Sequence, residues 1–221
     1  MGELNVIFHN NIINSTAPFQ AMNWEVGGNH WDNGYPGGGN YWSNYKGIDF
    51  YSGQYRNETG SDGIGDTAFL ACPVDRFRAV DNYPFMAPIN QFDAGIWNET
   101  KYDIDISSNS TISAFQLDIA KETLSFNVSD GTGIGFCRVT IPNIIVENLW
   151  LYNYTVLVDG EPPREVRNWT DSLNTYLYFT YEHSEHEVTI IPEFLSILIL
   201  PVFMIATILV VILYGRKNLS K

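Results

Sequence analysis

An uncharged apolar run near the C-terminus restricts this chain more than any other feature. It begins at Phe194, ends at Tyr214 and reads FLSILILPVFMIATILVVILY. A helix rises about 1.5 Å per residue, so this run is long enough to cross the roughly 30 Å hydrocarbon core of a bilayer. The alternative is a helix buried in a soluble core, for which the run is too long and too uniformly apolar. We therefore expect one transmembrane helix over residues 193–214.

The charges on either side of this helix predict its orientation. Arg216, Lys217 and Lys221 follow it, and basic residues next to a span mark the cytoplasmic side. The expected cytoplasmic tail is 215–221, and the bulk of the chain is then extracellular, on the cell membrane. All 25 acidic residues lie before residue 194, and the formal net charge is −13. An acidic surface repels nucleic acid, so we expect no nucleic-acid partner.

The first residues lack the signal that export of so much protein requires. MGELNVIFHNNIINS contains neither a basic n-region nor an apolar h-region. We expect that a signal peptide and further sequence precede Met1 and that the chain is a fragment.

Sequons support an extracellular location. The pattern N-x-S/T marks an acceptor for N-glycosylation on a surface segment of an exported protein, and seven sequons in the expected extracellular part are more than chance usually gives. We predict glycosylation at Asn14, Asn57, Asn98, Asn109, Asn127, Asn153 and Asn168.

The extracellular part divides into segments of different character. Residues 1–22 alternate short apolar runs with Asn, which is typical of the corner of a parallel β-helix rung. Residues 23–90 are rich in Gly, Asn, Trp and Tyr and have no regular period, which predicts a loop-rich cap held together by aromatic packing. Pro84 and Pro88 mark the linker that follows.

Residues 91–192 contain short runs in which apolar residues alternate with polar ones. This period of two predicts β-strands, and turn signals such as Asp130-Gly131 separate them. Six or seven strands over such a length are typical of an Ig-like β-sandwich. A single turn of helix is expected between Pro142 and Trp150. The runs cover residues 104–106, 115–119, 124–128, 136–141, 155–158, 176–181 and 188–190.

Three motifs in the cap segment carry a resemblance to a known family. They are NHWDNGYPGGGNYWSNY from Asn29, SDGIGDT from Ser61 and DNYPFM from Asp81. Together they resemble the C-terminal end of archaeal NosD-like right-handed parallel β-helix proteins, and NVIFHNNIIN resembles that family's last rung. The resemblance implies a solenoid whose open edge is covered by the cap. The family's binding and catalytic surfaces lie along rungs that this chain lacks.

Asp62 and Asp66 are the best candidates for metal ligands. They flank the tight turn Gly-Ile-Gly, where two carboxylates and main-chain carbonyls suit Ca²⁺ as a possible cofactor. Either Asp49 or Asp81 would fold back to complete such a site. The alternative is a glycine-rich turn in which the aspartates accept hydrogen bonds from the main chain.

The aromatic residues of the cap allow two interpretations. Trp31, Tyr35, Tyr41 and Trp42 would form a platform on which a glycan stacks, or they would fill the core of a small domain, which such large side chains commonly do. The sequence contains neither a GxSxG nor a Walker motif, and no motif selects a pair of glycosidase carboxylates.

The cysteines and histidines give weaker signals. Cys72 and Cys137 have no metal-binding spacing, and they are either buried free thiols or a disulfide. His183 and His186 are the only histidines at a short spacing, so the copper handling attached to the family name is not expected here.

These observations favour a non-enzymatic, membrane-anchored cell-surface protein that works in adhesion, envelope structure or glycan binding, with glycans or envelope proteins as partners. The alternative is the C-terminal fragment of a surface polysaccharide-processing β-helix enzyme whose catalytic rungs are missing.

Overall fold

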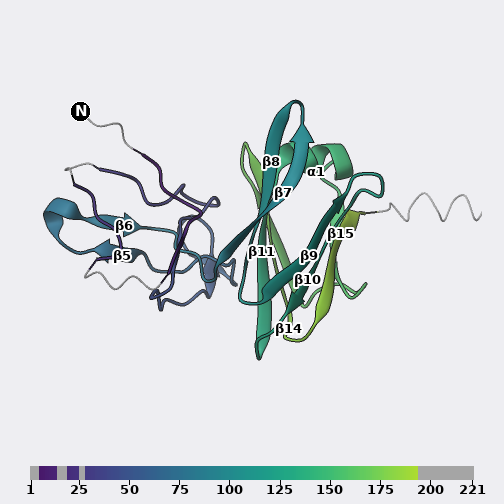
Figure 1. Cartoon of the computed structure of the whole chain (residues 1–221). Coiled ribbons are helices and arrows are strands. Elements are labelled where there is room, and N and C mark those ends of the chain that lie inside the picture. The colour runs from purple at the N-terminus through teal and green to yellow at the C-terminus, as the bar shows by residue number, and fades with distance from the viewer. Residues whose placement is uncertain (1–4, 14–18, 25–27, 194–221) are drawn as a thin grey trace, which may run out of the picture.

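A computed structural model describes residues 5–13, 19–24 and 28–193, and these residues form two parts that lie side by side (Figure 1). We call residues 5–86 the N-terminal module and residues 89–192 the sandwich. The described chain is mainly β with antiparallel sheets, which confirms the predicted fold class at that level. Within it, no helix has the length and apolarity that a membrane crossing needs. The apolar run 194–214 lies outside the described residues.

Two antiparallel sheets face each other in the sandwich. In spatial order, the five-stranded sheet contains β13 (Glu165–Thr170), β14 (Asn174–Glu182), β11 (Ile134–Pro142), β8 (Thr100–Ser108) and β7 (Ile89–Trp97). The four-stranded sheet contains β12 (Tyr154–Val158), β15 (His186–Pro192), β10 (Thr123–Ser129) and β9 (Thr111–Asp118). All seven predicted runs fall on these strands, although Ile119 lies just beyond β9 and is exposed.

The period-two pattern explains the sandwich core. In β10, Leu124, Phe126 and Val128 are buried while their neighbours are only partly so, because successive side chains point to opposite faces of a strand. They meet apolar residues of β11 and β14, such as Val139 and Phe179. The helix α1 (Asn143–Trp150) follows β11 at the predicted place and adds Ile145, Val146, Leu149 and Trp150 to the same core.

Short strands and aromatic packing build the N-terminal module, as predicted. Its strands are β1 (Asn11–Ile12), β2 (Tyr41–Trp42), β3 (Tyr51–Ser52), β4 (Glu58–Thr59), β5 (Phe69–Cys72) and β6 (Ala79–Asp81), with a 3₁₀ turn η1 (Asp75–Phe77) between the last two. Trp42, Ala71, Cys72 and Ala79 form the core of the module, and Trp31, Tyr45, Phe69 and Phe77 pack against it.

The first segment of the module pairs in parallel with a later one. β1 pairs with β2, and Val6 forms a parallel bridge with His30. These pairs are one or two residues long. No parallel β-helix is formed by the residues that the structure describes, so the rung expected over residues 1–22 stays a prediction.

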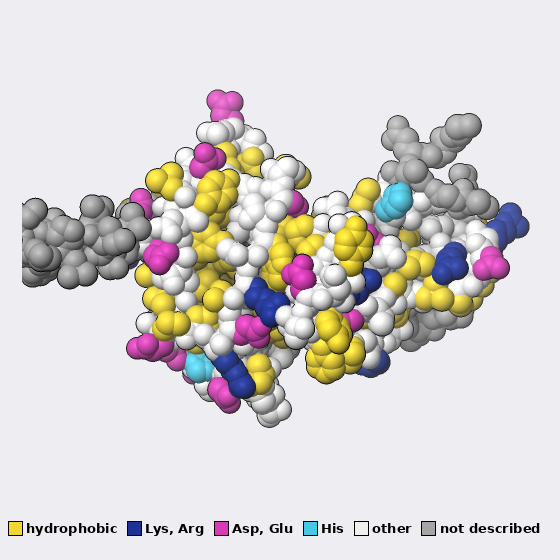
Figure 2. All heavy atoms as spheres, turned by 180° about the vertical axis from the view of Figure 1, so that it is seen from behind, with side chains coloured by type: hydrophobic (Ala, Val, Ile, Leu, Met, Phe, Trp, Pro, Cys, Tyr) yellow, Lys and Arg dark blue, Asp and Glu magenta, His cyan; other side chains and the backbone are white. Residues whose placement is uncertain are grey.

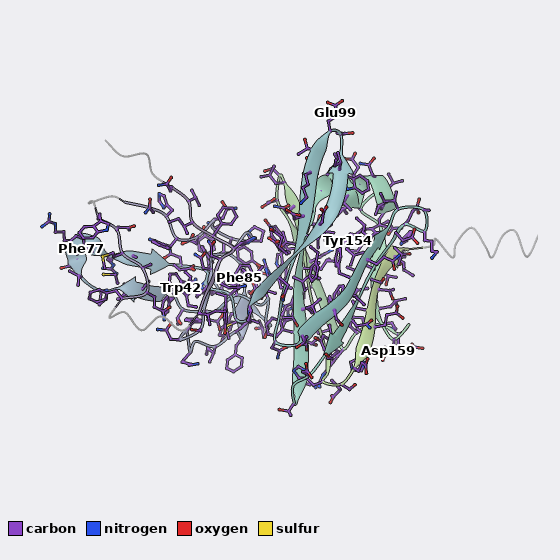
Figure 3. All side chains as sticks on the ribbon, viewed as in Figure 1. Trp42, Phe77, Phe85, Glu99, Tyr154 and Asp159 are labelled. Carbon is purple, nitrogen blue, oxygen red and sulfur yellow. The ribbon has the colours of Figure 1, made fainter. Side chains whose placement is uncertain are left out.

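The module packs on the outer face of the five-stranded sheet. Alternate residues of β11 and β14 face either the core or the module, so Arg138 and Tyr178 point outward while Val139 and Leu177 point inward. Figure 3 shows Phe85 between the two parts. The four-stranded sheet, which contains β15, lies on the far side of the sandwich (Figure 1). On the face that Figure 2 shows, acidic side chains are spread over both parts.

The two cysteines are free and buried. Cys72 belongs to the core of the module and Cys137 to the core of the sandwich, so no disulfide joins them. The interpretation as buried thiols is confirmed.

Candidate functional site

The turn that contains Asp62 and Asp66 lies where the module meets the sandwich. Asp62 is 2% exposed, and its Oδ1 accepts a hydrogen bond from Ile64 N at 2.9 Å. Gly63, which follows Asp62, has φ +84°, a backbone conformation that residues with a side chain rarely adopt. Gly63 also lies close to the side chain of Arg138. The sequence DGIGD therefore folds as a tight turn against the sheet.

Asp49 folds back onto this turn, as predicted, whereas Asp81 does not. Asp49 Oδ1 accepts a hydrogen bond from Asp62 N at 3.1 Å, and Asp49 Oδ2 accepts one from Gly63 N at 2.7 Å. Burial and the neighbouring charge of Asp62 raise the pKa of Asp49 to about 7. Burial also raises the pKa of Asp62. Two carboxyls thus share a site in which the charged forms are poorly solvated.

Asp66 binds the main chain at the start of β3. Its Oδ2 accepts a hydrogen bond from Phe50 N at 2.8 Å, and its Oδ1 accepts one from Tyr51 N at 3.2 Å. Each of the three carboxylates thus accepts main-chain hydrogen bonds, which is the arrangement expected of a structural turn. No group of three or more His, Cys, Asp or Glu side chains in the described chain is placed to hold a metal ion. Calcium at Asp62 and Asp66 stays a prediction.

Arg138 from β11 lies beneath this turn, and the sequence analysis did not single it out. It is 1% exposed, and its Nη1 donates to the carbonyl oxygen of Asp62 at 2.6 Å while its Nη2 donates to that of Pro36. Its guanidinium lies 5.6 Å from the ring centroid of Trp169 and 5.2 Å from that of Tyr176. Rings at such distances stabilise a cation. The alternation in FCRVTI places Arg138 on the outward face of the strand, but nothing in the strand itself indicates that this face is covered.

Further polar contacts join the two parts around Arg138. Arg167 of β13 donates from Nη2 to the carbonyl oxygen of Thr59 at 2.6 Å. His9 Nδ1 lies 2.8 Å from the carboxylate of Asp105 in β8. We call the contacts of Arg138, Arg167 and His9 the joint. Their spacing over three strands fixes the module on the sheet at several points.

Trp31 and Trp42 lie in or against the core of the module. Trp42 has no exposed surface, and its Nε1 donates to Asp81 Oδ2 at 2.8 Å. Trp31 packs against it with ring centroids 5.9 Å apart. This is the core role that the sequence offered as the alternative to sugar stacking, and Figure 3 shows Trp42 inside the module.

Tyr35 and Tyr41 lie elsewhere in the module and do not complete a common platform with the tryptophans. Tyr35 lies in the joint, with its ring centroid 6.3 Å from that of Trp169. Burial next to Asp62 raises the pKa of Tyr35. Tyr41 is half-buried in β2 and forms a parallel bridge with Phe85. Glycan stacking on these four residues stays a prediction.

The sequons differ in how free their amides are. Asn57 and Asn98 are exposed in turns, and Asn127 and Asn153 are half-buried. Asn109 is exposed, but its Nδ2 donates to Ile134 O at 3.1 Å, so a sugar there would replace one of two donor hydrogens. Asn168 is exposed at the edge of the five-stranded sheet. Asn14 lies outside the described residues.

At the hairpin between β14 and β15, a serine contacts a histidine and the histidine contacts an aspartate, as in the catalytic triad of a hydrolase. Ser184 Oγ lies 2.7 Å from His186 Nε2, and His186 Nδ1 lies 2.6 Å from Asp159 Oδ2. His186 Nε2 is also 2.7 Å from the carbonyl oxygen of Glu182, which only a protonated nitrogen can satisfy. The hydrogen bond to Asp159 raises the pKa of His186. Nε2 therefore carries a hydrogen that it donates to the carbonyl oxygen of Glu182, so it is not free to accept the proton of Ser184, and the ring instead links the hairpin to Asp159.

Nothing in the residue pattern indicated this chain of contacts, because Asp159 is brought to the hairpin only by the pairing of β12 with β15. Figure 3 shows Asp159 at the end of the sandwich, away from the joint.

Comparisons of the chain with protein-family models, with curated proteins and with solved structures found no match.

Proposed function

We propose that this chain is a non-enzymatic, membrane-anchored cell-surface protein that presents its N-terminal module away from the lipid, for adhesion, envelope structure or glycan binding. One observation carries the proposal. The module packs on the five-stranded sheet, whereas β15 ends at Pro192 in the other sheet, on the opposite side of the sandwich (Figure 1). An anchor that follows β15 would hold the module at the far end from the membrane.

The buried joint supports this role. A spacer that presents a domain must not bend freely, and the joint combines a fully buried arginine with contacts from Arg167 and His9. A shift of the module would break the hydrogen bonds that the buried Arg138 donates to the carbonyl oxygens of Asp62 and Pro36, and this cost favours one geometry. The parallel pairing of Val6 with His30 is in keeping with a module that caps a solenoid, as the NosD-like resemblance implies.

Membrane fractionation tests the proposal. The full chain is expected to sediment with membranes, to resist an alkaline carbonate wash and to be released by detergent, because the uninterrupted apolar run 194–214 is stable only in lipid. A matched chain that ends at Glu193 should appear in the soluble fraction with the same circular dichroism spectrum. Recovery of the full chain without detergent would sink the proposal.

A protease added to intact cells tests the orientation. It should digest the sandwich and the module but spare an epitope added after Lys221, since the positive-inside rule places that end in the cytoplasm. Protection of the acidic bulk together with digestion of the epitope would reverse the topology.

A further inference from the structure

A cavity of about 230 Å³ opens between the edge strands of the two sheets. β12 ends the four-stranded sheet and β13 ends the five-stranded sheet, and no strand of the described residues closes the gap between them. Its walls are mostly apolar and include Tyr154, Val156, Pro162, Pro163, Val166 and Leu177. We call this cavity the Asn168 groove, because Asn168 also lines it.

The strand register places Asn168 at the mouth of the groove. It pairs with Leu177, a core residue, so its side chain lies on the core-facing side of the sheet. At an edge strand this side is open, and Asn168 is accordingly exposed. Its Nδ2 donates a hydrogen bond to the hydroxyl of Tyr154 at 3.3 Å. A group attached to Nδ2 would therefore start next to the Tyr154 ring, which Figure 3 places in the sandwich.

We propose that the Asn168 groove seats the first sugar of an N-glycan attached to Asn168 of the sequon Asn168-Trp169-Thr170. This inference rests on the extracellular location in the proposed function. The attachment is a glycosyl transfer from a lipid-linked sugar phosphate. A bond forms between Nδ2 and the sugar C1, the bond from C1 to the phosphate oxygen breaks, the lipid phosphate leaves, and Nδ2 loses one proton.

The groove suits a sugar that is tethered at this point. Ligand sites commonly combine apolar and aromatic walls with a few polar groups that fix orientation. Tyr154, Pro163 and Val166 supply apolar surface for the face of a sugar ring. The glycosylated amide keeps one N–H, so it can still donate to the hydroxyl of Tyr154. Burial of apolar surface against the sugar then stabilises the fold.

Among the sequons that the structure describes, Asn168 alone lines the groove. Asn98 lies in the turn between β7 and β8, whose tip is marked by Glu99 in Figure 3. Neither Asn57 nor Asn98 lines the Asn168 groove. A glycan on Asn98 would extend into solvent and serves as the matched control.

The test compares the full chain made with a cleavable secretion signal in a glycosylating host with the same chain made unglycosylated in a bacterial cytoplasm. Mass spectrometry of glycopeptides measures occupancy, and thermal unfolding in detergent measures Tm. We expect Asn168 to be occupied. Asn168→Gln and Thr170→Ala should each lower the Tm of the glycosylated protein by about 2–4 °C. The same substitutions should change the unglycosylated protein by less than about 1 °C, and Asn98→Gln should have no effect in either form.

Coupling to the groove distinguishes a seated sugar from a merely attached one. In a Val166→Ser background, which removes apolar surface from the wall, Asn168→Gln should no longer lower Tm. Two results would overturn the inference and leave the proposed function intact. One is an unmodified Asn168 in a chain whose Asn98 is occupied. The other is a loss of Tm on Asn168→Gln that is the same in the parent chain and in the Val166→Ser background. A chain with no occupied sequon and no membrane association would overturn both.

Discussion

At the residue scale, Asp81 joins separate segments of the module through hydrogen bonds to its buried carboxylate. It is fully buried, and its Oδ2 accepts hydrogen bonds from Asn40 N at 2.7 Å and from Trp42 Nε1 at 2.8 Å. Its Oδ1 accepts a third from Tyr83 N at 3.0 Å. A Cβ on Gly39 would lie 1.9 Å from this carboxylate, so only glycine fits there. Two motifs that carry the family resemblance, GGGNYW and DNYP, meet at this carboxylate.

We predict that Asp81→Asn lowers the free energy of unfolding by about 1–3 kcal/mol, because an amide turns an N–H group toward a donor and leaves both unsatisfied. Denaturant unfolding followed by tryptophan fluorescence measures it, since Trp42 is the partner. Asp130→Asn, compared in unglycosylated protein because it creates a sequon with Thr132, is the control: Asp130 is exposed at φ 65°, which Asn tolerates, and the change should stay within about 0.5 kcal/mol. Equal stability of the two variants would contradict this role of Asp81.

The residue scale also marks where reasoning from the sequence succeeded. The alternation of apolar residues located β8 to β12, β14 and β15, and tight turn chemistry placed the aspartates in main-chain contacts. The role of Arg138 could not be predicted from the sequence. Only the packing of the module on the sheet explains why this charge points away from the core and is still buried.

At the scale of elements, two strands were missed for physical reasons. β7 has a register shift between Asp93 and Ile96, with Gly95 at positive φ, and such a bulge breaks the period of two. β13 is an edge strand, so its core-facing positions include the exposed Asn168 and Thr170 and it reads as polar. Neither reason is visible in a single stretch of sequence.

The contact of Asp49 with the turn at Asp62 should make stability depend on pH. The pKa of Asp49 rises from 3.8 to about 7, so the folded chain binds its proton more tightly than the unfolded chain does. This stabilisation is complete below about pH 4 and is lost as pH rises to about 7. Burial raises the pKa of Asp62 in the same direction, while the charge of Arg138 opposes that rise.

We therefore predict that the free energy of unfolding falls between pH 4 and pH 7, and that Asp49→Asn reduces the slope by up to one proton, about 1.4 kcal/mol per pH unit. Denaturant titrations at constant ionic strength measure the slope. Asp118→Asn is the control, because the pKa of the partly exposed Asp118 is lowered by its hydrogen bonds with Lys121. A slope unchanged by Asp49→Asn would contradict the raised pKa.

At the scale of the whole molecule, the joint decides whether the two parts move as one body. Spin labels on Tyr55→Cys in the module and Ile96→Cys in the sandwich would report it, because both positions are largely exposed and the native thiols Cys72 and Cys137 are buried. We predict a single narrow distance distribution for the parent chain.

Arg138→Met should broaden that distribution, because the carbonyl groups of Asp62 and Pro36 lose their charged donors, at a cost of about 1–3 kcal/mol each. Arg164→Met removes a surface arginine that pairs only with Glu182 among its described ion pairs, and it should leave the distribution unchanged. A broad distribution in the parent chain would mean that the joint does not hold.

The position of β15 also bears on how the molecule would carry mechanical load. It lies between β12 and β10 and pairs antiparallel with both along its length. A force applied to its C-terminal end along the strand would load two hydrogen-bond ladders in shear, so many bonds must break together rather than one after another. Tension from a tether at this end would therefore meet the strongest direction of the sheet, and the core would stay folded while the tether is stretched.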